Sequence, residues 1–200
     1  YTYNKNQNDI FISHCPERVL PGNIIHELFH NDRIIGGLTK KCAMKAGKFY
    51  KKFIKGKTIL TGANTAELCK LSENSFRDVN IAFANELSMI CDENKVDVWE
   101  LIRIANLHPR VNILQPGPGV GGHCIAIDPW FLTFTNSKTA KIIKQARLVN
   151  LNKEIYIYDK IKHIVHNHPK NIDQITIAYF GITFKANVND LRESPSLSIV

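Results

Sequence analysis

Residues 115–128, Gln-Pro-Gly-Pro-Gly-Val-Gly-Gly-His-Cys-Ile-Ala-Ile-Asp, begin with a glycine-rich run and contain a cysteine soon after the last glycine. Four glycines and two prolines fall within seven consecutive positions, which excludes a helix or a central strand. We expect a tight loop whose backbone a ligand can approach closely. Cys124 lies on the rim of this loop, and Asp128 follows four residues later. A thiol beside a carboxylate favours nucleophilic chemistry, and a plain turn before a buried cysteine is the alternative.

The glycines of this loop match nucleotide-binding motifs only in part. Gly117, Gly119 and Gly122 spell G-x-G-x-x-G, but the dinucleotide fingerprint also needs a preceding strand, a helix opening at the third glycine and an acid about 20 residues later. Prolines at positions 116 and 118, and the lack of an acid in residues 138–144, exclude that motif. The P-loop is excluded because no Gly-Lys-Ser/Thr follows.

The five cysteines follow no disulfide or zinc-binding pattern. Their number is odd and none form a C-x-x-C pair, which predicts a reduced, cytoplasmic chain without a structural zinc. A single His-Cys pair without a second ligand cluster also disfavours a metal site near the loop. The side chains considered for that site are His108, His123, Cys124 and Asp128.

Composition narrows the class of protein. A chain of 200 residues with 44% hydrophobic content supports one or two packed domains. No apolar run approaches the roughly 18 residues of a membrane span. The net charge of +8 suits an anionic ligand such as a nucleotide. The lysines of residues 40–57 indicate a solvated helix face rather than a nucleic-acid surface, because no aromatic platform accompanies them.

Alternating elements precede the residues that could act with the loop. Strands are expected at 9–15, 33–38 and 58–61 and helices at 23–31 and 39–53, which is typical of an α/β domain. Residues 63–94 contain no proline or glycine and have apolar residues at helical spacing. This pattern predicts one helix of about thirty residues, roughly 45 Å long.

Two faces of that long helix are distinguishable. Leu71, Phe83 and Leu87 are expected to be buried. Lys70, Asn74 and Arg77 recur at helical spacing and share another face, which a solvated stripe would also explain. We expect this second face to point toward the Cys124 loop.

After the long helix, the chain up to residue 166 is expected to be mostly helical. Helices are predicted at 98–106, capped by Asp97, and from Asp128-Pro129, with Trp130, Phe131, Leu132 and Phe134 in the core. A long helix follows at 139–166, with Ile142, Ile155 and Ile164 among its inward residues. The apolar run 175–180 predicts a buried parallel strand, and a helix begins at Pro195. Both ends suggest a piece of a longer protein, because the chain begins at Tyr1 and stops inside an apolar run.

Several motifs, in this order and spacing, resemble the UDP-glucose/GDP-mannose dehydrogenase family over nearly the whole chain. They are Cys15-Pro-Glu-Arg-Val-Leu-Pro-Gly22, Asn31-Asp-Arg-Ile-Ile-Gly-Gly37, Lys70-x-x-x-Asn74, Pro116-Gly-Pro-Gly-Val-Gly-Gly-His-Cys-Ile-Ala-Ile-Asp-Pro-Trp130 and Gly181-Ile-Thr-Phe-Lys-Ala-Asn-Val-Asn-Asp-Leu-Arg-Glu-Ser-Pro195. The resemblance implies an α/β chain in three parts. Residues 1–62 would be the tail of an N-terminal Rossmann-like NAD-binding domain. Residues 63–168 would form a helical central domain for dimerisation and catalysis, and 169–200 the start of a C-terminal Rossmann-like, UDP-binding domain.

The resemblance also implies a reaction. Family members oxidise the C6 alcohol of a nucleotide sugar to a carboxylate with two NAD, through a cysteine thiohemiacetal and thioester. Cys124 would be the nucleophile, and Lys70 the acid/base that stabilises the oxyanion. Asn74 would hold a water or oxygen, and Asp128 would orient Lys70 or activate water. Glu17 is a weaker candidate for the hydrolytic base.

Further residues match the family's binding positions. Arg192 would lie near the cofactor, and Arg110 would reach the neighbouring subunit's site. The substrate-binding set implied by the resemblance is Arg18, Val19, Arg77, His108, Arg110, Gly119, Phe184 and Lys185.

The resemblance finally implies the setting. We expect a cytoplasmic homodimer that binds NAD and a UDP-sugar, without nucleic acid or membrane. The Gly-His-Cys and Asp-Pro-Trp patterns favour an N-acetylmannosamine-type sugar, and UDP-glucose and UDP-N-acetylglucosamine are alternatives. The family's nicotinamide fingerprint would lie upstream of Tyr1. A truncated, non-catalytic dimerisation module is therefore the alternative function.

Overall fold

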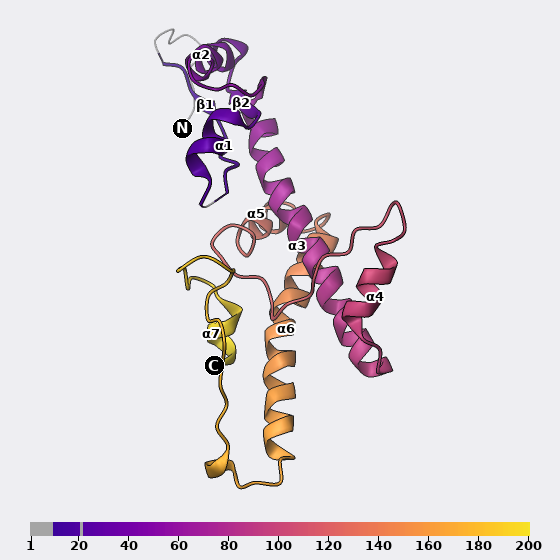
Figure 1. Ribbon diagram of the computed structural model, residues 1–200. Helices are drawn as coiled ribbons and strands as arrows, with labels where there is room; N and C mark the ends of the chain where they lie inside the picture. Colours follow the sequence, from indigo (N-terminus) through magenta and orange to yellow (C-terminus); the bar gives the residue numbers. More distant parts are fainter. Residues whose placement is uncertain (1–9, 21) are drawn as a thin grey trace. The chain divides into compact units, whose positions relative to one another are not determined.

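The computed structural model describes residues 10–20 and 22–200, and it divides into two compact units, residues 1–73 and 74–200. The expected α/β class is confirmed, because the chain combines a small sheet with a long helix (Figure 1). The domain boundaries expected after residues 62 and 168 stay predictions.

The first unit contains a three-stranded sheet of order β1-β2-β3. β1 (Ser13–His14) pairs antiparallel with β2 (Arg33–Gly37), and β2 pairs in parallel with β3 (Thr58–Gly62). α1 (Ile24–His30) connects β1 to β2, and α2 (Lys40–Tyr50) connects β2 to β3 and packs on both. The whole of β2 is buried, as a central strand should be. The expected strand start at residue 9 lies outside the described residues.

Local signals explain where the elements of this unit begin. The Thr39 hydroxyl accepts a hydrogen bond from the Cys42 amide at 3.2 Å, so the predicted cap of α2 is confirmed. Gly36 leaves room for the start of the helix that follows β3, because a Cβ at this position would lie 2.5 Å from the Ala66 Cβ.

α3 (Ala63–Asn94) is one continuous helix of 32 residues, as predicted. The prediction of its buried face was wrong in part, since Phe83 is 56% exposed and Leu71 and Leu87 are only half-buried. The residues it buries most completely in the second unit are polar or small, including Asp78, Asn85 and Ala84 at 0% exposure. Apolar periodicity therefore located the buried face only in part, because many of the side chains on the buried face of α3 are polar and form hydrogen bonds.

The second unit consists of helices and irregular chain. α4 (Val98–Ala105) begins after Asp97, whose carboxylate accepts from the Trp99 amide at 2.9 Å, which confirms this cap. α5 (Asp128–Thr135), a 3₁₀ turn at Ile172–Gln174 and α7 (Pro195–Ile199) accompany α6 (Lys141–His166), on which α5 and α7 pack.

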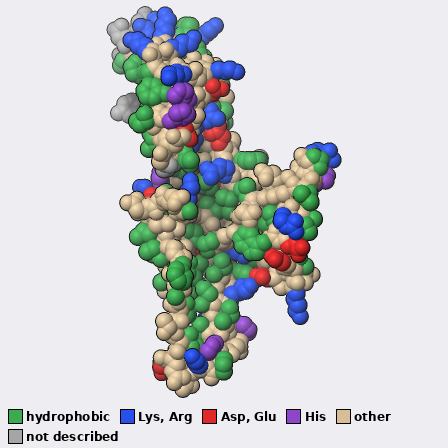
Figure 2. All heavy atoms as spheres, in the orientation of Figure 1, with side chains coloured by type: hydrophobic (Ala, Val, Ile, Leu, Met, Phe, Trp, Pro, Cys, Tyr) green, Lys and Arg blue, Asp and Glu red, His purple; other side chains and the backbone are tan. Residues whose placement is uncertain are grey.

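Several apolar residues of this unit are exposed where a core position was predicted. Leu132 is buried, but Phe131 is 58% and Phe134 89% exposed. On α6, Ile142, Ile155 and Ile164 are also exposed. Figure 2 shows hydrophobic side chains on the surface of this unit. A single copy of this part of the chain has too few elements to cover both faces of each helix.

The predicted buried strand at 175–180 was wrong. The segment has no regular secondary structure, and none of the three strands in the described residues pairs with it. Ile177 is 58% and Phe180 92% exposed. A β-branched run becomes a buried strand only where neighbouring strands complete its ladder.

No helix in the described part of the chain is long and apolar enough to cross a membrane. Within residues 10–20 and 22–200, no group of three or more His, Cys, Asp or Glu side chains is arranged to hold a metal ion.

Candidate active site around Cys124

The glycine-rich loop, residues 115–128, leads directly into α5 through a turn at Cys124. The Cys124 carbonyl accepts from the amides of Ile127 at 3.1 Å and Asp128 at 2.8 Å. Cys124 is a free, half-buried thiol. Asp128, which the sequence predicted as the N-cap before Pro129, is the first residue of α5, and Ile127 is its N-cap, so the helix begins one residue earlier than predicted. The turn therefore places Cys124 just before the N-terminus of α5.

Asp128 is held by one of the residues expected to act with it. The Asn74 amide nitrogen donates to the Asp128 carboxylate at 2.5 Å. Asn74 is only 5% exposed and lies on α3, a rigid element. The structure thus brings together two predicted catalytic residues that are 54 positions apart in the chain.

Arg192 lies within electrostatic reach of Cys124. Its guanidinium donates to Asp190 at 2.6 and 2.9 Å, and these hydrogen bonds hold the pKa of Asp190 at about 2. The pKa of Arg192 is raised mainly by Asp190, and Cys124 adds to the rise. The Arg192 carbonyl also accepts from the Gly122 amide at 3.2 Å. A cation that Asp190 holds in place therefore lies near Cys124.

Two glycines allow residues 181–195 to approach the loop. A Cβ at Gly122 would lie 2.9 Å from the Phe184 ring, and one at Gly121 would lie 2.6 Å from the Phe184 Cβ. Gly122 also has φ +83°, a conformation that favours glycine. Phe184 is thus brought to the loop, whereas Lys185 beside it is exposed.

Gly119 faces α6. Its φ is +150°, and a Cβ there would lie 3.0 Å from the Glu154 Cγ. Burial raises the pKa of Glu154, partly opposed by a hydrogen bond with Ser198 and the charge of Arg147. α6 therefore packs against the loop at Gly119, which is one of the predicted substrate-binding residues.

The remaining predicted residues of the second unit are not joined to the loop by a described contact. His108 and Arg110 lie in the exposed turn after α4, where the Arg110 amide donates to the His108 ring at 3.3 Å. Arg77 is an exposed residue of α3.

The first unit carries the other four predicted site residues. Glu17 forms an ion pair at 3.2 Å with Arg33, whose side chain is 5% exposed. Arg18 forms one at 3.0 Å with Glu73 on α3. Lys70 and Val19 are half-buried. The parts that these four residues play in the site stay predictions.

Sequence reasoning missed a set of buried polar side chains beside the loop, which we call the buried polar chain. Its members are Asp78 and Asn85 on α3 and Arg147 and Asn150 on α6. Each is at most 2% exposed. The available signal was a pair of polar residues seven positions apart in α3 and another three positions apart in α6, but the same spacing also describes a solvated stripe.

Comparison with known proteins agrees with the motifs. Residues 2–54 match the NAD binding domain of the UDP-glucose/GDP-mannose dehydrogenase family, and residues 64–153 match its central domain. The first match confirms NAD as the expected cofactor.

Curated relatives and solved structures extend the likeness over nearly all of the chain. A UDP-N-acetyl-D-mannosamine dehydrogenase of Campylobacter jejuni is 60% identical over 96% of this chain and 46% of its own length. An NDP-N-acetyl-D-galactosaminuronic acid dehydrogenase of Ralstonia solanacearum is 58% identical over 97% of this chain and 45% of its own.

The structure of a UDP-N-acetyl-mannosamine dehydrogenase from Staphylococcus aureus has a TM-score of 0.84 and 49% identity, and covers 96% of this chain and 45% of that one. The chain therefore spans less than half the length of the relatives it matches. The two domain matches and these identities show that the chain belongs to the UDP-glucose/GDP-mannose dehydrogenase family.

Proposed function

We propose that this chain is part of an NAD-dependent nucleotide-sugar 6-dehydrogenase of polysaccharide biosynthesis in the cytoplasm. Its substrate would be UDP-N-acetyl-D-mannosamine, whose C6 alcohol is oxidised to the uronic acid. The observation that carries the proposal is that the Cys124 carbonyl accepts from the amide of Asp128, whose carboxylate is held by Asn74, and that Cys124 interacts electrostatically with Arg192. Relatives named for mannosamine and galactosaminuronic acid substrates support an acetamido sugar.

The chemistry that this arrangement supports is a two-stage, four-electron oxidation. After the first hydride leaves C6, the Cys124 thiolate attacks the aldehyde carbon, a C–S bond forms, and the carbonyl oxygen gains a proton. Loss of a second hydride from the same carbon leaves a thioester. Water then displaces the thiolate and the sugar carboxylate is released. A thiolate suits this sequence because it is both a good nucleophile and a good leaving group.

Each predicted site residue would have a separate role in this reaction. Arg192 would place a positive charge near Cys124. Asn74 would orient Asp128, which would direct the hydrolytic water. Lys70 would donate to the developing oxyanion.

The chain also has a group that fits the cofactor. The Arg192 side chain is 67% exposed and already ordered by Asp190, so it can donate to a phosphate oxygen of a dinucleotide. NAD, when bound, accepts the hydride.

A homodimer is part of the proposal. In the second unit, Phe76 and Phe83 on α3 are 69% and 56% exposed, and Phe134 on α5 is 89% exposed. Faces with several exposed aromatic side chains commonly mark protein interfaces. The same observation favours a dimerisation module without catalysis as the second candidate function. Light scattering of the full-length protein at micromolar concentration should report a dimer, and a monomer would contradict this part.

A single-turnover assay tests the proposed reaction. The full-length protein should form two NADH per UDP-N-acetyl-D-mannosamine, and UDP-glucose and UDP-N-acetylglucosamine should react more slowly. Cys124→Ser should nearly abolish acid formation while it retains sugar-nucleotide binding. Lys70→Ala should slow turnover by roughly 10²- to 10³-fold if it supplies one oxyanion donor.

Cys69→Ser is the matched control, because Cys69 is a half-buried thiol on α3 outside the loop. It should retain two NADH per sugar. An undiminished yield of two NADH from Cys124→Ser would remove Cys124 from the mechanism. A protein that dimerises but oxidises none of the three sugars would favour the non-catalytic module.

A further inference from the structure

We propose that Asn85 is a positioning residue that fixes the Cys124 loop through the main-chain amide of Gly117. Asp78 sets the orientation of the Asn85 side-chain amide through the buried polar chain. The catalytic consequence rests on the proposed function, but the structural part does not. The proposal concerns how a loop without regular secondary structure is held in a single conformation.

Asn85 connects the loop to α6. Its side-chain oxygen accepts from the Gly117 amide at 2.8 Å. Its side-chain nitrogen donates to the Asn150 oxygen at 2.9 Å. Both asparagines are 0% exposed, so water does not compete for these bonds. A buried amide that lost such a partner would be costly, which gives the contact its specificity.

The orientation of Asn85 follows from the chemistry at the far end of the chain of bonds. The Asp78 carboxylate can only accept, and it accepts from Asn150 at 2.8 Å. Asn150 must therefore present its nitrogen to Asp78 and its oxygen to Asn85. Asn85 must then present its nitrogen to Asn150 and its oxygen to the Gly117 amide.

Arg147 maintains the charge on which this order depends. It donates to Asp78 at 2.6 Å, and the two side chains are 2% and 0% exposed. Burial raises the pKa of Asp78, and the charge and hydrogen bond of Arg147 oppose the rise. With Asp78 protonated, its hydroxyl could donate and the order of donors and acceptors would no longer be unique.

The loop is consequently tied to α3 on both sides of Cys124. Gly117 is held by Asn85, and Asp128 is held by Asn74. Between these points Gly122 is held by the Arg192 carbonyl. Release of the Gly117 contact should loosen the loop upstream of the thiol without disturbing Asn74 and Asp128.

Amide hydrogen exchange and thiol alkylation test this without any need for activity. In the full-length protein, Asn85→Ala should speed exchange of the amides in residues 115–123 by about 10-fold or more, as expected for loss of a buried hydrogen bond. Alkylation of Cys124 by iodoacetamide should change by several-fold. Asn80→Ala is the control, because the Asn80 side chain bonds only the Phe76 carbonyl of its own helix among the described contacts.

Two further variants keep the test decisive. Asn85→Ser has a side chain too short to reach both partners and should give the same loop exchange if Asn85→Ala folds poorly. Asp78→Asn combined with Arg147→Met removes both charges and lets the amides reverse. It should raise exchange at Gly117 while circular dichroism reports intact helices.

The kinetic readout is a split between kcat and KM. Asn85→Ala should lower kcat by roughly 10- to 100-fold, because the thiol is misplaced, with KM for the sugar nucleotide changed by less than about threefold. Loop exchange and alkylation equal to those of Asn80→Ala would overturn the proposal. Faster loop exchange in a protein whose wild type oxidises no sugar would instead leave Asn85 as a loop anchor and reject only the proposed reaction.

Discussion

The glycine-rich loop and residues 175–193 both lack helix and strand, and both carry predicted site residues, yet they are held differently. The loop is fixed by Asn74 and Asn85, which are 5% and 0% exposed and belong to a rigid helix. In residues 175–193, Asp190 and Arg192 bond mainly each other, and Phe180 is 92% exposed. Buried side chains of α3 therefore hold the loop at both ends, whereas residues 175–193 accept one described bond from a buried side chain, from the Ser194 hydroxyl to the Ile182 carbonyl at 2.8 Å.

The difference also separates two kinds of ion pair. Asp78 and Arg147 are desolvated, so each depends on its partner for compensation of its charge. Asp190 and Arg192 remain in contact with water, which compensates either charge when the other is removed.

The largest effect is expected from Arg147→Ala. The change leaves the Asp78 carboxylate buried and unpaired, and should lower the free energy of unfolding by about 3–5 kcal/mol. Urea denaturation of the full-length protein would measure it. Arg192→Ala is the comparison and should lower the denaturation midpoint much less, because water compensates the exposed Asp190 charge. Equal losses from the two variants would show that burial does not separate these pairs.

A smaller effect is expected from a methyl group within the loop. Gly122→Ala places a Cβ 2.9 Å from the Phe184 ring at φ +83°, and should cost about 1–3 kcal/mol of stability. Gly117→Ala is the matched control, because a Cβ there meets nothing within 4 Å. Its unfolding free energy should change by less than about 0.5 kcal/mol. A neutral Gly122→Ala would mean that residues 181–195 can retreat from the loop.

Local signals account for the elements that the sequence predicted well. Thr39 and Asp97 cap helices because their side chains bond amides two or three residues ahead. The length of α3 was predictable because proline and glycine are absent from it. By contrast, the state of residues 175–180 depends on a neighbouring strand, and no local pattern reports its presence.

The site was predictable to the extent that motifs carry it. Cys124, Asn74 and Asp128 were predicted from residue type and resemblance. The Asn74–Asp128 contact joins two of them, and their catalytic roles stay predictions. Asn85 was missed because an asparagine within a helix looks the same whether it faces water or a loop amide. Only the packing of α3 on α6 through Asn150 distinguishes the two cases.

The acid titration of Asp190 sharpens the comparison further. Its pKa of about 2 is below the ordinary value of 3.8, so the stabilisation is present above 3.8 and is lost as pH falls through about 2. Carbon-13 NMR of the carboxyl groups should show this midpoint in the wild type and a return toward 3.8 in Arg192→Ala. A midpoint that stays near 2 in the variant would assign the shift to the Arg192 main-chain amide, which donates to Asp190 at 3.0 Å and remains in the variant.

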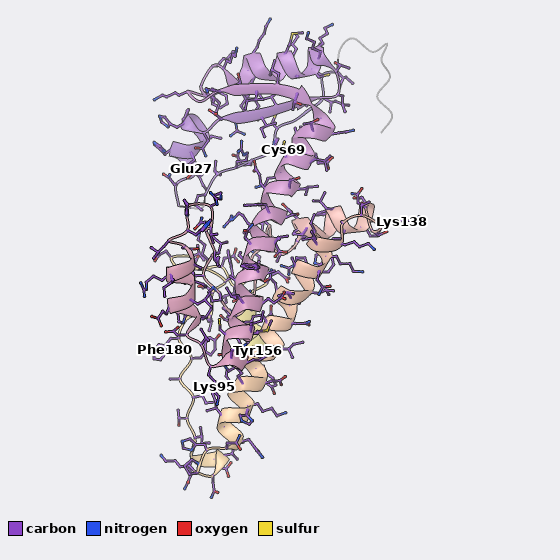
Figure 3. The ribbon with its side chains drawn as sticks, turned by 90° about the vertical axis from the view of Figure 1, so that its right-hand side faces the viewer. Glu27, Cys69, Lys95, Lys138, Tyr156 and Phe180 are labelled. Atoms are coloured by element: carbon purple, nitrogen blue, oxygen red, sulfur yellow. The ribbon has the colours of Figure 1, made fainter. Side chains whose placement is uncertain are left out.

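The smallest effect is expected at Tyr156, which lies on α6 beside the C-terminal part of α3 (Figure 3). Its hydroxyl donates to Asp92 at 2.6 Å, and this bond, more than burial, raises the pKa of Tyr156 to about 12. A raised pKa keeps the phenol protonated, so the contribution is complete below pH 10 and is lost as pH rises through about 12.

Asp92→Asn should lower the pKa of Tyr156 toward 10, because the carboxylate charge that opposes phenolate formation is gone. Carbon-13 NMR of the tyrosine ring, assigned with Tyr156→Phe, would follow it, and Lys160→Met serves as the control, since Lys160 also donates to Asp92. A Tyr156 pKa that stays at about 12 in Asp92→Asn would make burial the cause. The exposed end of the α3–α6 contact would then behave like its buried centre, and the contrast between buried and exposed polar groups would not hold along this helix pair.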